Sequence, residues 1–137
     1  MKYFIIAILF YTPSVFGQKI EDSKIIISLK DNNDIYRKVK IALINADFIV
    51  KDNYNVDTLT TYAREFTDMA GHCVIFAIIV GNSVTLNGFY SLKKQGLVGF
   101  PLNTNNFQKV LYYKSSKSWD LLQKVAEGIG GQITYSK

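Results

Sequence analysis

Cysteine and histidine are nearly missing from this sequence, which has one of each, Cys73 and His72, in 137 residues. A single cysteine excludes an intramolecular disulfide, so stability must come from a hydrophobic core. One histidine beside one cysteine also falls short of the nitrogen and sulfur ligands of a protein zinc site. On a strand, these neighbours point to opposite faces and cannot act together as base and nucleophile. We therefore expect a buried, unreactive Cys73, no role for His72, and neither metal nor cofactor.

The sequence also has no apolar run as long as the roughly 20 residues that a membrane-spanning helix needs. The chain begins with Met1 and the basic Lys2, followed by an uncharged apolar stretch over residues 3–11, a proline, and then Val15-Phe16-Gly17. This order is typical of a cleavable secretory signal peptide, with an uncleaved anchor as the alternative. We predict a signal peptide over residues 1–17 and a mature N-terminus at Gln18, which can cyclise to pyroglutamate. Without a cysteine at the cleavage site, no lipid anchor is expected, and no stable membrane anchor remains after cleavage.

The rest of the chain has room for one domain with one modest core, because domains cluster near about 100 to 150 residues. Residues 18–23 are polar and predict a flexible lead-in, so the domain covers residues 24–137. Lysine and arginine number 16 against 11 acidic residues. This mild excess is common in small exported proteins that bind no polyanion, and we expect no nucleic-acid partner.

In the first half of the domain, the short β-branched segment Lys24–Leu29 predicts a strand. Asp31 to Asp34 supplies turn and helix-capping chemistry, and apolar residues recur at helical spacing from Ile35. This spacing predicts a helix that ends near Asn45 to Asp47. Two strands are then predicted, at Phe48–Lys51 and Thr58–Phe66, joined by a polar turn.

The apolar run Cys73–Val80 predicts a central strand, and Ser83–Leu92 predicts its hairpin partner across Gly81-Asn82. Residues 93–106 form an apolar-rich loop that can fold over the edge of the core as a lid. Phe107–Lys114 favours a strand, although its apolar residues also match helical spacing.

A second helix is predicted near the C-terminus, with Ser118 as N-cap and Asp120 in its first turn. Gly130-Gly131 ends it, and Gln132–Ser136 follows as a short extended segment. Its apolar stripe is Trp119, Leu122, Val125, Ala126 and Ile129.

These elements predict an α+β fold of β-α-β-β-β-β-α order, an antiparallel β-meander with both helices on one face. This arrangement can leave a cavity between the sheet and the last helix, and we expect Phe76 to point inward. The element order, the helix Ser118–Ala126 and the ending Gly130–Tyr135 resemble small exported domains of unknown function in Gram-negative bacteria. Those domains have a TATA-binding-protein-like or helix-grip architecture. The resemblance implies that fold, an extracytoplasmic compartment and a binding role, and it assigns no catalytic residue.

Candidate catalytic groups are few. Paired carboxylates such as Glu65 with Asp68, or Asp31 with Asp34, could do acid and base work, but they lie in polar, turn-like segments. The glycines lack the lysine and helix start of a phosphate-binding loop. Aromatic and basic residues do interleave near the loop, which suits a glycan or anionic surface but is also typical of a protected strand edge. They are Phe107, Lys109, Tyr112, Tyr113, Lys114 and Lys117.

The sequence therefore predicts a noncatalytic envelope protein, periplasmic or secreted, that binds a small apolar ligand or an envelope protein. The predicted ligand groove lies between the sheet and the C-terminal helix. Two alternatives stay open, a carboxylate-based periplasmic hydrolase and a structural assembly module. The predicted ligand-binding residues are Trp119, Tyr112, Tyr113, Phe100 and Lys114.

Overall fold

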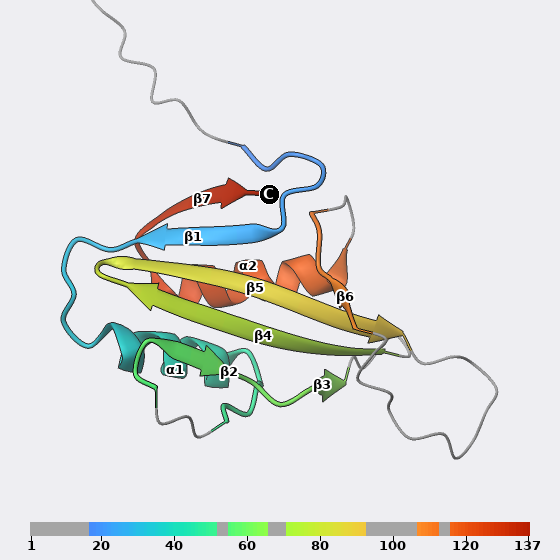
Figure 1. The fold of residues 1–137 in the computed structure, drawn as a ribbon, viewed down its shortest axis with the longest axis horizontal. Coiled ribbons are helices and arrows are strands. Elements are labelled where there is room, and N and C mark those ends of the chain that lie inside the picture. Colours follow the sequence, from blue (N-terminus) through green and yellow to red (C-terminus); the bar gives the residue numbers. More distant parts are fainter. Residues whose placement is uncertain (1–16, 52–54, 66–70, 93–106, 113–115) are drawn as a thin grey trace, which may run out of the picture.

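The computed structural model describes residues 17–51, 55–65, 71–92, 107–112 and 116–137 (Figure 1). The predicted signal peptide, apart from Gly17, and the predicted loop over residues 93–106 lie outside the described residues. Among the described residues, no helix has both the length and the apolar character needed to cross a membrane.

The described chain forms two helices and one antiparallel sheet, and the predicted α+β class is confirmed. The sheet order is β2-β4-β5-β1-β7, with β3 paired to β4 and β6 paired to β5. Both helices lie behind one face of this sheet (Figure 1). The elements are β1 (Lys24–Ser28), α1 (Ile35–Asn45), β2 (Thr58–Thr60), β3 (Arg64–Glu65), β4 (Gly71–Val80), β5 (Ser83–Leu92), β6 (Gln108–Lys109), α2 (Lys117–Ile129) and β7 (Gln132–Ser136).

The hairpin of β4 and β5 is the longest pairing in the sheet, and it turns at Gly81-Asn82 as predicted. Gly81 has a φ of 58°, a left-handed conformation that glycine adopts without a steric cost. The first and last strands complete the sheet, because β1 lies between β5 and β7. The C-terminal segment is therefore an edge strand paired along its whole length with β1.

Two other predicted strands are shorter than expected. In the segment Phe48–Lys51, only Val50 makes a bridge, to Thr61. The segment Thr58–Phe66 divides into β2 and β3, and Thr61 between them binds β4 with its side chain as well as its backbone. The Ile75 amide donates to Thr61 Oγ1 at 3.0 Å, and the Thr61 amide donates to the Ile75 carbonyl at 3.1 Å.

The start of α2 corrects the prediction of Ser118 as N-cap. The N-cap is Ser116, whose Oγ accepts from the backbone amide of Trp119 at 3.3 Å. A capping serine binds the amide two or three residues ahead, and Ser116 stands at that distance from Trp119, whereas Ser118 lies inside the first turn. The helix ends at Gly130 and Gly131, both with positive φ. At Gly131 a Cβ would lie 2.6 Å from the carbonyl oxygen of Ser28, so β1 can approach only a glycine here.

Residues 18–23, predicted as a lead-in, contact the domain. The Ser23 amide donates to the Ser136 carbonyl at 2.8 Å, and the Asp22 carbonyl accepts from the Tyr112 amide at 2.6 Å. Glu21 forms an ion pair of 2.9 Å with Lys137, whose hydrogen bond and charge lower the pKa of the Glu21 carboxyl. These contacts join the segment before β1 to the end of β7.

The core lies between the helices and one face of the sheet, here called the inner face. It consists of the alternate residues of β1, β4 and β5 packed against the apolar stripes of α1 and α2. Gly88 on β5 shows how closely these layers meet, since a Cβ there would lie 2.5 Å from Leu122 Cδ1 and 3.0 Å from Val110 Cγ2. The fully buried inner residues of the three strands are Ile25, Ile27, Cys73, Ile75, Ala77, Val84 and Leu86.

Candidate functional site

The predicted groove beside α2 is occupied by the protein's own side chains. Trp119 is 2% exposed, and its ring lies 5.6 Å from the ring of Tyr112 and 6.1 Å from that of Tyr135. The structure thus brings together two of the five predicted ligand-binding residues, Trp119 and Tyr112, as packing partners. The other three, Tyr113, Phe100 and Lys114, lie outside the described residues.

Trp119 keeps one polar atom without a partner. Its indole Nε1 is buried and has no hydrogen-bond acceptor within the part of the chain that the structure describes. The nearby polar groups bind one another instead, since the Tyr135 hydroxyl donates to Gln123 Oε1 at 3.1 Å. Gln18 Nε2 donates to the same oxygen at 3.2 Å.

The opposite side of the sheet, here called the outer face, is covered by neither helix (Figure 1). Strand alternation assigns its residues, because β4 residues paired in register with β5 alternate between the two faces. Ile75 and Ala77 are fully buried on the inner face, so Phe76 between them points outward. The prediction of an inward Phe76 is therefore wrong, since a residue one step along a strand changes face.

Every outer position of β4 after His72 is apolar. These residues are Val74, Phe76, Ile78 and Val80, of which Ile78 is 42% and Val80 71% exposed. An antiparallel strand with one solvated face normally alternates apolar and polar side chains. The neighbouring strands do carry polar residues outward, with Thr85 and Asn87 on β5 and Thr58 and Thr60 on β2.

An aromatic pair lies across β4 and β5 on this outer face. The rings of Phe76 and Phe89 are 5.4 Å apart at 84°, an edge-to-face contact. Both side chains are half-buried. The pair is diagonal, because Phe76 is directly opposite Asn87 and Phe89 is directly opposite Val74. Such pairs stabilise a sheet by about 1 kcal/mol and form a firm apolar surface.

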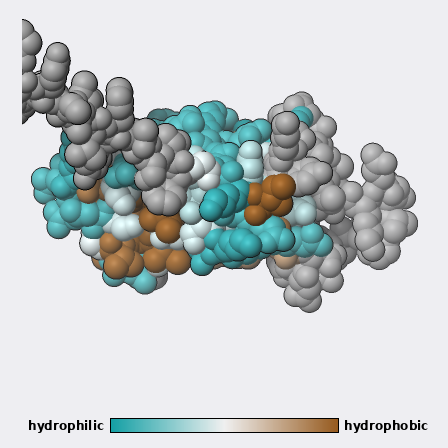
Figure 2. Space-filling view, turned by 90° about the horizontal axis from the view of Figure 1, so that it is seen from above, coloured by the Kyte–Doolittle hydropathy of each residue, from teal (hydrophilic) through white to brown (hydrophobic). Residues whose placement is uncertain are grey.

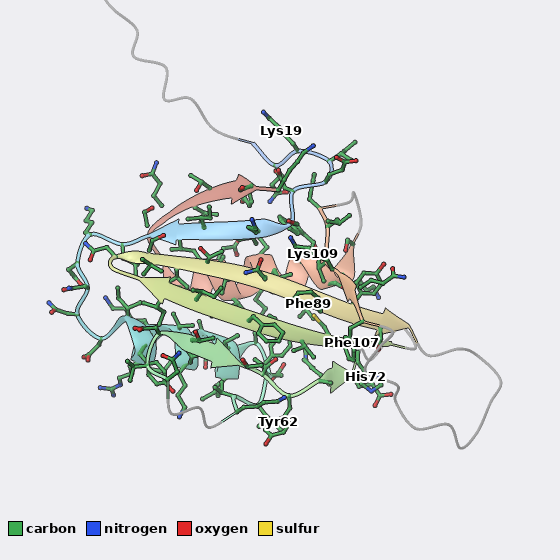
Figure 3. All side chains as sticks on the ribbon, viewed as in Figure 1. Lys19, Tyr62, His72, Phe89, Phe107 and Lys109 are labelled. Atoms are coloured by element: carbon green, nitrogen blue, oxygen red, sulfur yellow. The ribbon has the colours of Figure 1, made fainter. Side chains whose placement is uncertain are left out.

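Two lysines flank this aromatic pair from one side of β5. Lys24 on β1 is opposite Asn87. Lys109 on β6 is opposite Phe89, and Figure 3 labels both of these residues. Because Asn87 and Phe89 are two residues apart on one strand, the two lysine backbones are about 7 Å apart along the sheet. Within the part of the chain that the structure describes, neither lysine forms an ion pair. Their exposure differs, with Lys109 exposed and Lys24 half-buried.

The predicted aromatic and basic group near the loop is divided by the structure. Lys109 faces outward on β6, whereas Tyr112 packs on Trp119. Lys117 is the first residue of α2, and Tyr113 and Lys114 lie outside the described residues. Lys24, which belongs to a different part of the sequence, is the basic residue that joins Lys109. Only the register of β1 and β6 against β5 reveals this pairing.

At the end of the hairpin away from Gly81, three polar residues form one outward row. His72 is opposite Ser91 on β5 and opposite Glu65 on β3. His72 and Ser91 are 8% and 5% exposed, and neither His72 Nδ1 nor Ser91 Oγ has a hydrogen-bond partner within the described ranges. A nucleophile activated by a base needs a hydrogen bond between the two groups. Within the described residues, Ser91 Oγ is therefore not hydrogen-bonded to His72 Nδ1.

Cys73 faces inward, away from His72, as the strand alternation predicts. Its side chain is fully buried, and burial raises the pKa of the Cys73 thiol to about 12, although the charge of Arg64 opposes the shift. One predicted carboxylate pair is exposed, and the other lies partly outside the described residues. Asp31 and Asp34 are exposed, with Asp31 paired to Lys38 at 3.6 Å, and Asp68 lies outside the described residues. Within the described residues, no three potential metal ligands gather.

The candidate site is thus the outer face of the sheet, with Phe76 and Phe89 at its centre and Lys24 and Lys109 beside them. Figure 2, which looks onto the β7 edge, shows a different surface on which hydrophilic residues surround small separate groups of hydrophobic ones. Comparison with protein families, curated proteins and solved structures finds no match to this chain. The assignment of the site therefore depends on the physical properties of these side chains.

Proposed function

We propose that this protein is an exported, noncatalytic interaction module that binds a partner protein on the outer face of its sheet. The observation that carries the proposal is the unbroken apolar character of the outer positions of β4. Apolar side chains on both faces of a strand are typical of a sheet that is covered on both sides. Both helices cover the inner face, and a partner would cover the outer one.

Packing argues against the alternative of a small ligand beside α2. Gly88 lies so close to Leu122 and Val110 that a methyl group would not fit between them. Two tyrosine rings pack against Trp119. A ligand there would have to displace core side chains, which costs several kcal/mol. The outer face needs no such displacement, because Ile78 and Val80 are already accessible.

The outer face is better suited to a protein partner than to a purely apolar small molecule. Threonine and asparagine side chains alternate with the apolar ones, with Thr58, Thr85 and Asn87 beside Ile78 and Phe76. A purely apolar partner would leave these polar groups without hydrogen bonds, at a cost of about 1–3 kcal/mol each. A polypeptide offers amides and carbonyls to these groups and side chains to the phenylalanines. Export is supported by the signal-peptide pattern of residues 1–17.

Site-specific crosslinking in the native host tests this proposal. A photoreactive phenylalanine analogue replaces Ile78 on the outer face, and in a matched control it replaces Ile44, which is 50% exposed on α1. We expect a discrete crosslinked product from position 78, in the extracytoplasmic fraction, and none of that product from position 44. A further substitution, Phe76→Thr, should remove the product while the protein remains folded.

Equal products from both positions, or a product from position 78 that survives Phe76→Thr, would show that the outer face has no special role. A product found only in the cytoplasm would leave the binding surface in place and contradict export. Circular dichroism of each variant serves as the check on folding.

A further inference from the structure

We infer that the partner segment bound by the outer face is acidic, with carboxylates that bind Lys24 and Lys109 and an apolar side chain that packs on Phe76 and Phe89. This inference rests on the proposed function and names the chemistry of its partner. It follows from the placement of two cations beside an aromatic pair.

Within the described residues, Lys24 and Lys109 form a pair that no carboxylate neutralises. Both lie on the same side of β5, opposite Asn87 and Phe89, and their backbones are about 7 Å apart. Like charges at this distance repel one another, and within the described part of the chain neither lysine has a carboxylate partner. On the same face, Glu65 lies on β3, and both β5 and β4 separate it from the line of the lysines. A carboxylate from outside would relieve the repulsion.

The spacing of these groups fits an extended segment. Side chains on one face of a strand repeat at about 7 Å, which equals the step from Lys24 to Lys109 and the step from Asn87 to Phe89. A segment with carboxylates two residues apart can therefore contact both lysines. An apolar side chain directed toward β4 would then reach the edge-to-face ring pair.

A second copy of this chain fits poorly. Two outer faces brought together would add a second lysine pair to the same interface, and the chain has a net charge of +5. Like-charge contacts of this kind oppose association. An anionic membrane would satisfy the lysines but not the threonine and asparagine side chains of β2 and β5. An acidic polypeptide satisfies all three features of the surface.

Titration with defined peptides tests the inference. The probe is a capped ten-residue peptide of serine and glycine that carries one phenylalanine, one leucine and four glutamates. Its control has lysine in place of each glutamate. Amide chemical shifts of the whole protein report where each peptide binds. We expect the acidic peptide to shift Val74, Phe76, Asn87 and Phe89 and to bind at least tenfold more tightly than the basic one at low salt, with the preference falling as salt rises.

Charge reversal identifies the groups responsible. The double variant Lys24→Glu with Lys109→Glu should reverse the preference. The matched control, Arg37→Glu with Lys124→Glu, makes the same change in net charge on α1 and α2 and should preserve it. Both double variants change exposed or half-exposed residues, so both should remain folded.

Equal affinity for the two peptides, binding of neither, or equal loss of preference in both double variants would overturn the inference. Vesicles of phosphatidylglycerol that shift the same four amides while the acidic peptide does not would overturn it in favour of a membrane surface. None of these outcomes decides the proposed function, because the position 78 crosslink can still form with a neutral or basic partner. Loss of that crosslink, in contrast, contradicts the proposed function itself.

Discussion

The two faces of the central hairpin are built from the same strands and differ in what their side chains contact. On the inner face, Gly88 of β5 fits closely against Leu122 of α2, and Cys73 and Ala77 of β4 belong to the same buried core. On the outer face, the ring of Phe76 contacts that of Phe89, and Ile78 remains accessible. The inner face is complementary to a helix that the chain supplies. The outer face is apolar and neither helix covers it, and this difference locates the site.

The comparison predicts unequal costs of truncation on the two faces. Trp119→Ala removes the largest buried side chain and should lower the free energy of unfolding by about 4 kcal/mol. Phe76→Ala, a truncation of similar chemistry at a half-buried position, should cost about 1–2 kcal/mol. Denaturant unfolding of both variants measures the difference. Equal costs would mean that the two faces are equally buried.

Gly88 tests the close fit of the inner face. Gly88→Ala places a methyl group against Leu122 and Val110 and should lower the free energy of unfolding by about 2 kcal/mol. The matched change Gly128→Ala, in α2, meets Ala42 Cβ at 3.3 Å and gains helix propensity, so it should be within about 0.5 kcal/mol of neutral. A neutral Gly88→Ala would show that α2 packs loosely enough to admit a ligand.

Thr61 and Thr60 are neighbours that face different environments. Thr61→Val removes the buried acceptor of the Ile75 amide and should cost about 1–2 kcal/mol. Thr60→Val changes a half-exposed outer residue and should cost less than about 0.5 kcal/mol. Thermal unfolding of the two isosteric variants gives the comparison, and a larger cost for Thr60 would contradict the assignment of faces.

Cys73 adds a pH dependence that belongs to the inner face. Its thiol has a pKa raised from the ordinary 9.0 to about 12, so the unfolded chain loses this proton first as pH rises. The stability from the neutral thiol is fully present below pH 9 and is lost progressively toward pH 12. At pH 10 the loss should be about 1 kcal/mol, measured as the difference between the protein and its Cys73→Ala variant.

The neighbouring outer position gives the contrasting result. In the Cys73→Ala background, Val74→Cys should react with iodoacetamide at pH 8, whereas Cys73 in the unmodified protein should react only when the chain unfolds. Rapid reaction of native Cys73 would contradict its burial.

Much of this fold could be predicted from local patterns. The hairpin follows from two apolar runs around Gly81-Asn82, and α2 follows from the stripe that begins at Trp119. Both patterns concern residues near in sequence, where periodicity and turn chemistry act directly. The N-cap was displaced by two residues because three of the five residues from Lys114 to Ser118 are serines with similar capping ability.

The candidate site required information that local patterns do not hold. An apolar run such as Cys73–Val80 has apolar residues of both parities, so it does not reveal that Phe76 points away from the helices. The approach of Lys24 to Lys109 depends on two strands, far apart in sequence, that pair with the same side of β5. Register over such distances is a property of the assembled sheet. The available signal was the unbroken apolar run of β4, whose outer positions contain no polar residue between Val74 and Val80.

The accessibility of methyl groups on the two faces tests the central claim most directly. A soluble paramagnetic agent is added to the protein with labelled isoleucine and valine methyl groups, and line broadening is measured at each one. We predict strong broadening of Ile78, Val80 and Val74 and little broadening of Ile75, Ile25 and Val84. Protection of the outer methyl groups equal to that of the inner ones would show that the chain covers this face itself, and the outer face would then be no site for a partner.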